Sequence, residues 1–444
     1  MFIPNDVKII MNCLKKNGYE SYIVGGSIRD FKIGTSSPKD YDIATNALPE
    51  EIIKLFDKTI PTGVQHGTVT VMINKEGYEV TTYRIDGEYL DNRRPDDVTF
   101  VSNLEDDLAR RDFTINALAF NEEDGLIDYF GGTEDLVNKI IRAVGEPNKR
   151  FKEDALRMLR AIRFSARLDF EIEENTFEAI KANSHLILNV SNERIRDELC
   201  KMMISDNTTK ALRLLEKSKL LEYILPELKA TVGFNQQNTH HDKDIFEHTL
   251  AVVEKCPPDL NLRVAGLLHD IAKPSCFTVD AKGIGHFYGH DKKGVILSEQ
   301  ILRRFRFDNK SINEISILVK EHMNICAKPT DSSVKRLINR VGKDLVFDLF
   351  NLQRADALGS CFSEKRIDEI DRVEEKTIAI LKSKVPLSTR ELAVNGRDLM
   401  NEFFLSPGGE IGEILKFLLD KVLENPELNN KKKLLCIVYD EYMK

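Results

Sequence analysis

Two short segments near the N-terminus constrain this chain most: a small-residue turn at Gly25–Asp30, and an acidic pair, Asp40 and Asp42, that begins ten residues after the turn ends. Glycines let a backbone approach an anion closely, and Arg29 adds a fork of donors for phosphate oxygens. Asp40 and Asp42 flank one tyrosine, so strand alternation places both carboxylates on one face, where they can hold Mg²⁺. Together the two segments predict a site for metal-assisted nucleotidyl transfer.

Each segment alone also fits a simpler alternative, a glycine turn and a solvated acidic loop, because short motifs often match by chance. The order and spacing of the two favour the functional interpretation. A third carboxylate, Glu79, lies on a later predicted strand, but a surface position explains it equally well, so it stays outside the predicted site.

Composition narrows the class of protein. The 444 residues are 42% hydrophobic and 31% charged, which fits a globular protein of about two to four domains. A net charge of −8 argues against broad nonspecific binding of nucleic acid, because such binding depends on Lys and Arg. No signal-peptide core and no apolar run long enough to cross a bilayer is visible, so we expect a cytoplasmic protein without a membrane partner.

The residue pattern changes once along the chain, at about residues 140–150. Before this point, strand-like segments alternate with helical ones, which predicts an α+β domain. After it, the apolar spacing is mostly helical and prolines mark the breaks. The predicted strands are Tyr22–Gly26, His66–Asn74, Tyr78–Ile85 and Val98–Val101, and the predicted helices include Pro49–Phe56 and Leu104–Phe120.

A third motif, Arg110–Leu118, begins with paired arginines ahead of an expected helix. Its Asn116 is a candidate contact for a sugar hydroxyl or a phosphate. An Arg–Asp ion pair at a helix start is the simpler alternative.

A fourth motif, Glu153–Arg163, is expected to be one helix with a polar stripe. A carboxylate can accept from the exocyclic amine of a base, and an arginine can donate to a ring nitrogen or carbonyl. Asp154 and Arg157 suit that function, although a local salt bridge between them would give the same pattern.

These four motifs, in this order, resemble the class II tRNA nucleotidyltransferases, the CCA-adding enzymes, and their relatives the bacterial poly(A) polymerases. The resemblance implies a DNA polymerase beta-like head followed by all-helical neck, body and tail domains. The corresponding ranges are a nucleotidyltransferase head at 1–140, a helical neck and RNA-binding region at 141–235, an HD-type helical domain at 236–360 and a tRNA-binding tail at 361–444.

The resemblance also implies roles for single residues. The 3′-hydroxyl of tRNA would attack the α-phosphate of CTP or ATP and expel pyrophosphate, without an RNA template. Asp154 and Arg157 would act as the amino-acid template that pairs with the base. By motif position, Gly26 and Arg29 would contact the triphosphate, Asp40 and Asp42 would bind Mg²⁺, and Arg111, Asp154, Arg157, Arg160 and Arg163 would contact the nucleotide.

Two segments separate the relatives within this family. Pro61–Val69 looks like the CCA-adding pattern, where the poly(A) polymerases carry a basic and aromatic stretch. Asp86–Phe100 resembles a loop that CC-adding enzymes shorten, which indicates that the terminal A is added too. Near the C-terminus, Asn395–Met400 and Pro407–Gly412 are similar to the family's tail region. CC addition and poly(A) synthesis remain the alternative activities.

A second group of residues, in the middle of the chain, resembles the metal ligands of the HD phosphohydrolase superfamily: His248, His269, Asp270 and Asp356. Imidazole and carboxylate together can bind a transition metal and polarise a phosphate ester. This predicts an accessory hydrolase for phosphomonoesters or 2′,3′-cyclic phosphates, or else a relict site in a helical RNA-binding region. Possible additional ligands or phosphate contacts are His286, His290 and His322. The motifs do not specify an oligomeric state.

Overall fold

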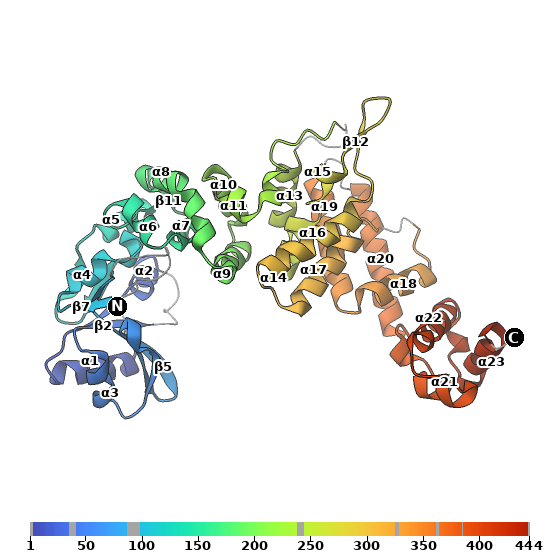
Figure 1. Ribbon diagram of the computed structural model, residues 1–444, viewed down its shortest axis with the longest axis horizontal. Helices are drawn as coiled ribbons and strands as arrows, with labels where there is room; N and C mark the ends of the chain where they lie inside the picture. The colour runs from blue at the N-terminus through green and yellow to red at the C-terminus, as the bar shows by residue number, and fades with distance from the viewer. Residues whose placement is uncertain are drawn as a thin grey trace. The chain divides into compact units, whose positions relative to one another are not determined.

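A computed structural model describes residues 3–34, 41–86, 98–237, 244–324, 328–360, 364–383 and 385–442. The chain divides into two compact units, Met1–Pro226 and Glu227–Lys444, and Figure 1 labels the elements of both. Two features of the sequence lie outside the described residues: Asp40, and residues 87–97 of the segment that resembles the family loop.

The first unit contains a mixed sheet and a set of helices. The helices are α1 (Asn5–Lys16), α2 (Gly26–Lys32), α3 (Pro49–Leu55), α4 (Leu104–Ala109), α5 (Gly132–Asn138), α6 (Pro147–Glu153), α7 (Leu156–Leu168), α8 (Glu174–Asn183), α9 (Asn192–Met203), α10 (Thr208–Lys217) and α11 (Leu220–Ile224), with α12 (Pro226–Lys229) at the unit boundary. Short 3₁₀ turns are η1 (Val64–His66), η2 (Thr114–Asn116) and η3 (Ser184–Asn189).

Seven strands form the main sheet in the order β3-β4-β5-β2-β1-β8-β9. Strands β2 and β5 run parallel, and the other neighbours are antiparallel. These strands are β1 (Ser21–Val24), β2 (Asp42–Thr45), β3 (Thr59–Gly63), β4 (Thr68–Ile73), β5 (Glu76–Thr82), β8 (Leu118–Asn121) and β9 (Gly125–Asp128). Smaller pairs are formed by β6 (Arg84–Asp86) with β7 (Val98–Phe100), and by β10 (Ile140–Ile141) with β11 (Glu171–Ile172).

The register of β1 and β2 explains how two distant motifs meet. Val24, the last residue of β1, lies opposite Asp42, the first residue of β2. The glycine turn follows Val24 directly, so hydrogen-bonded pairing of the two strands places that turn beside the Asp42 carboxylate. The α+β head predicted from the sequence is confirmed, as are its predicted strands.

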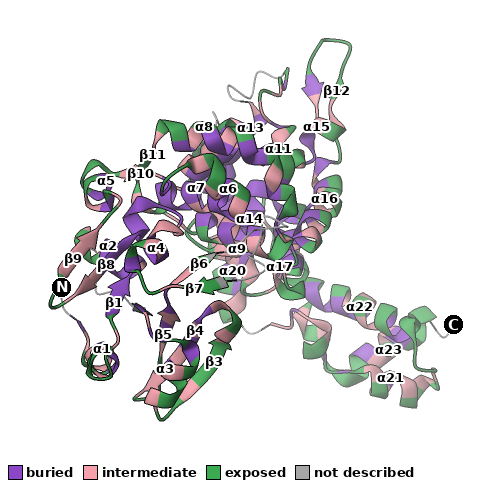
Figure 2. Ribbon diagram, turned by 60° about the vertical axis from the view of Figure 1, so that its left-hand side comes forward, coloured by how far each residue is buried: buried purple, intermediate pink, exposed green. Residues whose placement is uncertain are grey.

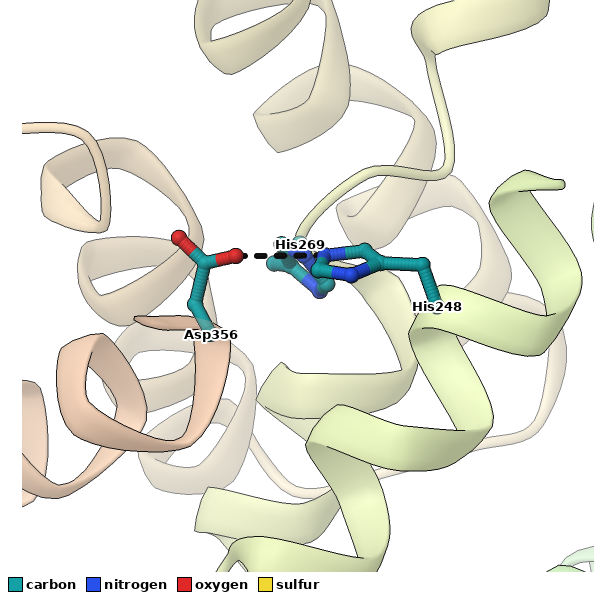
Figure 3. A group of neighbouring side chains, drawn as sticks. All are labelled: His248, His269 and Asp356. Carbon is teal, nitrogen blue, oxygen red and sulfur yellow. Dashed lines mark ion pairs between the residues drawn. The ribbon is translucent and has the colours of Figure 1, made fainter. Parts of the chain in front are cut away.

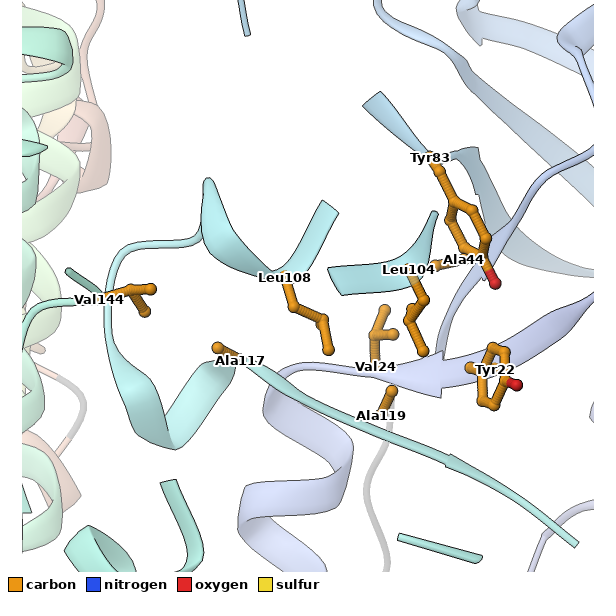
Figure 4. Packing of buried hydrophobic residues seen from close by; sticks show 9 residues of the cluster. All are labelled: Tyr22, Val24, Ala44, Tyr83, Leu104, Leu108, Ala117, Ala119 and Val144. Atoms are coloured by element: carbon orange, nitrogen blue, oxygen red, sulfur yellow. The ribbon is translucent and has the colours of Figure 1, made fainter. Parts of the chain in front are cut away.

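One face of this sheet is covered by α4. Leu104 and Leu108 project from that helix into the apolar cluster drawn in Figure 4, where Leu108 is fully buried. Two tyrosines complete the cluster with their hydroxyls at its edge, since Tyr22 donates to Asp124 Oδ2 at 2.7 Å. The buried members are Tyr22, Val24, Ala44, Tyr83, Leu104, Leu108, Ala117, Ala119 and Val144.

Two predicted helices are interrupted. The expected helix Leu104–Phe120 ends at Ala109, and the chain continues through η2 into β8, because Ala119 and Phe120 pair with β1 and complete the sheet. Tertiary pairing here overrides local propensity. The expected helix Glu153–Arg163 breaks after Glu153, and α7 starts at Leu156.

Helix α7 is the central element of the helical part of the first unit. Ten of its 13 residues are buried, and they include Arg157 and Arg163 among the apolar side chains (Figure 2). Charged residues are rarely buried unless they are paired. The positions of these arginines therefore require partners, which the site below supplies.

The part of the second unit that the structure describes is helical apart from one two-stranded hairpin, β12 (Thr278–Val279) with β13 (Gly285–His286). Helices α13, α14 and α19 pack against one another, and so do α16 and α17. None of the described helices is long and apolar enough to span a membrane. The helices are α13 (Ile245–Lys255), α14 (Leu260–Leu268), α15 (Lys273–Cys276), α16 (His290–Arg304), α17 (Asn309–Glu321), α18 (Asp331–Val341), α19 (Leu345–Gly359), α20 (Glu364–Lys382), α21 (Gly396–Phe403), α22 (Gly409–Glu424) and α23 (Lys431–Tyr442), with turns η4 (Thr389–Glu391) and η5 (Pro426–Leu428).

Truncating the core leucine of α4 tests this packing. We expect Leu108→Ala to destabilise the first unit by about 2–5 kcal/mol, because a fully buried leucine leaves a cavity. Urea denaturation followed by circular dichroism measures the change. Leu188→Ala, at a leucine that is 66% exposed, is the matched control and should shift stability by less than about 0.5 kcal/mol. Equal effects of the two variants would contradict the assigned core.

Candidate functional site

A cavity of about 390 Å³ lies in the first unit, between the sheet edge and α7. Its volume is within the range of about 300–1,000 Å³ that is typical of ligand pockets. Six arginines and three aspartates give the lining a net charge of +3, although the whole chain carries −8. The lining residues are Gly25, Gly26, Arg29, Asp42, Arg110, Arg111, Asp112, Asn116, Asp154, Leu156, Arg157, Arg160, Phe164 and Arg194.

The glycine turn is required at one wall of this cavity. Gly25 has φ +73°, a conformation that other residues rarely adopt. A Cβ at this position would lie 3.1 Å from Arg111 Nη1 and 4.0 Å from Asp42 Oδ2. The turn therefore brings a glycine backbone, an arginine and a carboxylate together, as the sequence predicts.

Asp112 connects the two sides of the cavity. Its Oδ1 accepts from Asn116 Nδ2 at 3.0 Å, and its Oδ2 accepts from Arg160 Nε at 2.7 Å. Asn116 Oδ1 in turn accepts from Arg29 Nη1 at 2.6 Å. Burial opposes ionisation of Asp112, but the positive charge of Arg160 and these hydrogen bonds outweigh it and lower the pKa of the carboxyl to about 2. One carboxylate thus ties the glycine-turn helix α2 to α7.

Arg29 is held inside this network and is not a free surface cation. It is 3% exposed and its Nε donates to Asp30 Oδ1 at 2.8 Å. Its guanidinium carbon lies 4.9 Å from the ring centroid of Phe164, and that of Arg160 lies 5.4 Å away. An aromatic face attracts cations at these distances. Phe164 therefore helps to keep two arginines in the cavity wall.

The paired arginines of the third motif share one aspartate that precedes them in the chain. Arg110 Nη2 and Arg111 Nη2 donate to Asp107 at 2.7 and 3.1 Å, and Asp107 is fully buried in α4. The simpler alternative, an Arg–Asp ion pair, is therefore present, but it lies at the C-terminal end of α4 and not at a helix start, while Asp112 pairs with Arg160.

Asp154 and Arg157 both face the cavity, but they do not pair with each other among the described contacts. Asp154 lies at the break between α6 and α7, where its Oδ1 accepts from the Leu156 N–H at 3.1 Å. Its Oδ2 accepts from Arg194 Nη2 at 2.8 Å. Arg157 Nη1 donates to Glu153 Oε2 at 2.7 Å, and its Nη2 donates to the Arg110 carbonyl at 2.9 Å. The local salt bridge proposed as the alternative is therefore absent.

Two predicted site residues are not among the described residues that line the cavity. Arg163 is buried and donates through Nε to Glu198 Oε2, and it is not part of the cavity lining. Asp40 lies outside the described residues, so its pairing with Asp42 stays a prediction.

A second cluster, in the other unit, gathers the residues that resemble HD-type ligands. His248 comes from α13, His269 and Asp270 follow α14, and Asp356 comes from α19. His248, His269 and Asp356 are buried, and their ligand atoms lie within 4.8 Å of one another. Figure 3 shows the three side chains directed toward one another. His248 Nε2 lies 3.1 Å from Asp356 Oδ1.

Asp270 lies between this group and a further one, made with His290 and His322. Its Oδ2 is 3.1 Å from His269 Nε2, and its Oδ1 is 3.4 Å from His290 Nε2 and 3.9 Å from His322 Nε2. The two carboxylate oxygens thus face two different sets of imidazoles. This geometry offers two candidate metal positions with a shared aspartate.

The histidine rings are oriented for metal binding. The Nδ1 atoms of His269, His290 and His322 lie 2.6–2.8 Å from the carbonyls of Gly266, Phe287 and Val319, respectively. If those Nδ1 atoms carry the proton, each Nε2 presents a lone pair, the arrangement found at metal ligands. Among the described residues, these three buried Nε2 atoms have no well-aligned hydrogen bond.

Electrostatics hold His322 and Asp270 in their ligand forms, whereas Asp270 and Asp356 raise the pKa of His269 despite its burial. Burial lowers the pKa of His322 to about 4, so its imidazole is neutral at pH 7. The pKa of Asp270 is well below its ordinary value, because His269 and Lys273 outweigh the effect of burial. Lys273 Nζ lies 2.7 Å from Asp270 Oδ2, and Arg366 Nη2 lies 3.1 Å from Asp356 Oδ2.

His286 does not join this cluster. It lies in the β12–β13 hairpin, where its Nε2 is 3.0 Å from Asp280 Oδ2. Sequence proximity to His290 suggested a ligand, but the hairpin directs His286 to a local carboxylate.

Several cavity residues escaped sequence reasoning. Arg194 and Phe164 carried no motif signal, and Arg194 reaches Asp154 from 40 positions further along the chain. Asp112 belongs to the third motif, but its partner Arg160 lies on α7, 48 positions further along the chain. The cue that the sequence offers is the number of arginines in Leu156–Leu168, because charged side chains on a buried helix need acidic partners.

The Asp112 network makes a testable contribution to acid stability. Because the pKa of Asp112 in the folded protein is about 2 and its ordinary value is 3.8, the ionised form stabilises the fold fully above about pH 4. About 2 kcal/mol should be lost as the pH falls from about 4 to 2. Urea denaturation at several pH values should show that Asp112→Asn lacks this loss. Asp57→Asn, at an exposed aspartate, is the control. Parallel pH profiles for wild type and Asp112→Asn would contradict the assignment.

Comparisons with known proteins agree with this architecture. Three family models match in order along the chain: the poly A polymerase head domain at residues 21–142, the RNA and SrmB-binding site of polymerase A at residues 169–231, and a tRNA nucleotidyltransferase domain 2 at residues 296–438. The first match contains the sheet and the glycine turn, and the third contains His322 and Asp356.

Individual relatives are similar over nearly the whole chain or over about half of it. The CCA-adding enzyme of Ligilactobacillus salivarius is 34% identical over 445 residues, which cover 98% of this chain and 96% of the relative. That of Lactobacillus helveticus is 51% identical over 213 residues, covering 48% of this chain and 53% of the relative. The crystal structure of the Bacillus stearothermophilus CCA-adding enzyme in complex with CTP matches with a TM-score of 0.73 and 30% identity, and it covers 97% of this chain and 96% of its own. With this identity across nearly all its residues and the motifs in place, the chain belongs to the family of CCA-adding enzymes, the tRNA nucleotidyltransferases.

Proposed function

We propose that this protein adds and repairs the 3′-terminal CCA of tRNA, using CTP and ATP. The observation that carries this proposal is a cavity with a net positive lining that brings together the glycine turn, Asp42, Asp154 and Arg157. Relatives named CCA-adding enzymes, one of them solved with CTP, support the same activity. They favour CCA addition over poly(A) synthesis.

The triphosphate is the part of the substrate that the cavity suits best. Six arginines in its lining can neutralise a polyanion, and arginine forks match phosphate oxygens. Gly25 and Gly26 allow the backbone to approach the phosphates. Arg29 packs against Gly26, because a Cβ placed on Gly26 would lie 3.3 Å from Arg29 Nη2. We assign Gly26, Arg29 and Arg111 to this part of the site.

Asp42 fits the donor set for Mg²⁺, because its carboxylate lines the cavity next to the phosphate-binding turn. We propose that Asp40 and Asp42 hold the metal. Bound Mg²⁺ would supply Lewis-acid polarisation of the α-phosphate and activation of the attacking hydroxyl. The residues of the chain orient the α-phosphate for in-line attack by the tRNA 3′-hydroxyl, and pyrophosphate leaves.

Base selection is assigned to Asp154 and Arg157. Cytosine and adenine both present an exocyclic amine, which can donate to the carboxylate of Asp154. Arg157 can donate to a ring nitrogen or a carbonyl oxygen. Arg160 lines the cavity and stays a proposed nucleotide contact. Arg163 stays one because of its position in the motif.

The four-domain division and a cytoplasmic location stay predictions.

Removing the Asp42 carboxylate tests the transfer mechanism. We expect Asp42→Ala to lower the rate of CMP incorporation into tRNA that ends at the discriminator base by at least about a thousandfold, because metal binding would be lost. Labelled CTP and ATP, given separately and together with Mg²⁺, report the length of the products. Asp57→Ala is the matched control on the same unit. Wild-type rates for Asp42→Ala and Asp40→Ala would refute this assignment, and a long A tail would indicate a poly(A) polymerase.

The buried histidine cluster favours a second activity. We propose that the cluster of His248, His269, Asp270 and Asp356, extended by His290 and His322, binds transition-metal ions and hydrolyses phosphomonoesters or 2′,3′-cyclic phosphates. Bound metal would supply an activated water and polarise the phosphate. Lys273 and Arg366 add positive charge for the phosphate at the same place.

Metal content and phosphate release test this second activity. After incubation with Ni²⁺ or Co²⁺ and desalting, we expect two ions per chain by elemental analysis, and phosphate release from 2′-nucleotides. Asp270→Ala should lose metal at both positions, because its two oxygens face both groups of histidines. His185→Ala, at an exposed histidine, should keep wild-type metal content. Bound metal without hydrolysis would leave a relict site, and absence of metal would exclude the hydrolase.

A further inference from the structure

Arg194 is the one cation of the nucleotide cavity that reaches it from α9. Its side chain is 29% exposed, and its Nη2 donates to Asp154 Oδ2 at 2.8 Å. The charge of this arginine is thus placed on the carboxylate to which base selection is assigned.

The hydrogen bonds of Asp154 fix the direction of its carboxylate. Oδ1 accepts from the Leu156 N–H at 3.1 Å, and Oδ2 accepts from Arg194. Each carboxylate oxygen can accept two hydrogen bonds, so acceptor capacity remains on both. A base that meets this edge therefore encounters acceptors in a fixed position.

The second residue assigned to base selection is also held by hydrogen bonds. Arg157 is anchored by Glu153 Oε2 at 2.7 Å and by the Arg110 carbonyl at 2.9 Å. Glu153 also accepts from Arg150 Nη1 at 2.8 Å. Neither selecting side chain depends on the nucleotide for its orientation, and such preorganisation sharpens discrimination.

We propose that Arg194 is a specificity-determining positioning residue, which holds Asp154 so that it accepts the amine of C or A and rejects the carbonyl of U or G. This inference rests on the proposed function. Uracil and guanine present O4 and O6 at the place where cytosine and adenine present an amine. A carbonyl oxygen placed against a fixed carboxylate leaves two hydrogen-bond acceptors facing each other, which disfavours binding. A carboxylate that is free to rotate can turn away and so rejects the wrong base less well.

A second nitrogen of Arg194 points to the same role. Nη1 is buried, and among the described residues it has no hydrogen-bond partner. Because Arg194 lines the cavity, an oxygen of a bound nucleotide is a candidate acceptor for this donor. A purely structural ion pair between α9 and the α6–α7 junction would not require an unsatisfied donor at this position.

Nucleotide discrimination tests the proposal directly. The values of kcat/KM are measured for CTP and UTP on tRNA ending at the discriminator base, and for ATP and GTP on tRNA ending in CC. For Arg194→Ala we expect the CTP/UTP and ATP/GTP ratios to fall at least tenfold, mainly through faster use of UTP and GTP. Arg194→Lys should restore part of each ratio. Arg196→Ala, on the same helix with its guanidinium on the exposed Asp197, should keep wild-type ratios.

A double-mutant cycle separates positioning from a general loss of stability. If Arg194 acts through Asp154, then Asp154→Ala and the double variant Asp154→Ala/Arg194→Ala should have equal ratios, because the second change has nothing left to orient. Arg194→Gln, which keeps an amide donor, replaces the alanine variant if that variant fails to fold.

The outcomes are distinct. A wild-type protein that selects C and A, together with an Arg194→Ala variant that is equally selective, overturns this inference alone. Additive losses of selectivity in the double variant also overturn it. A wild-type protein that incorporates neither CMP nor AMP overturns the proposed function, and the inference with it.

Discussion

The bonds of the Asp112 carboxylate are the interaction on which the nucleotide cavity depends. Asp112 is 8% exposed, and it accepts from Asn116 on one side and from Arg160 on the other. Through Asn116 it fixes Arg29 beneath the glycine turn. A buried carboxylate is costly unless it is paired, so this arrangement is stable only when α2 and α7 are both in place. The wall of the cavity therefore depends on one carboxylate that both sides share, and neither the glycine turn nor α7 forms it alone.

The same principle accounts for the charge of the cavity. Arginines would repel one another if they were merely collected there, and each one has a defined counterpart: Asp107 for Arg110 and Arg111, Glu153 for Arg157, Asp154 for Arg194. Their partners neutralise part of the charge and orient the guanidinium groups, while a net positive lining remains for a polyanion. An acidic protein can thus offer a local site for nucleotides without binding nucleic acid broadly over its surface.

The second unit solves a related problem with imidazoles in place of arginines. Six ligand-type side chains are buried together, and backbone carbonyls beside Nδ1 leave Nε2 directed inward. Such a group is expensive to bury without a cation to bind it. Lys273 and Arg366 compensate for part of its negative charge. The arrangement couples the packing of α13, α14 and α19 to the chemistry of the site.

The sequence by itself determined the order of the motifs, the α+β head, the helical remainder and the residue types at both sites, because these depend on local spacing and periodicity. It also predicted that Asp154, Arg157, His248 and Asp356 would be functional candidates. It overextended two helices: the first because the strand pairing of β8 is not a local preference, and the second because a local hydrogen bond from the Leu156 N–H to Asp154 Oδ1, at the break between α6 and α7, was not recognised. Only the tertiary structure decided which charges meet. Arg160 with Asp112 and Arg194 with Asp154 are separated by 48 and 40 positions, and no helical or strand period relates residues so far apart.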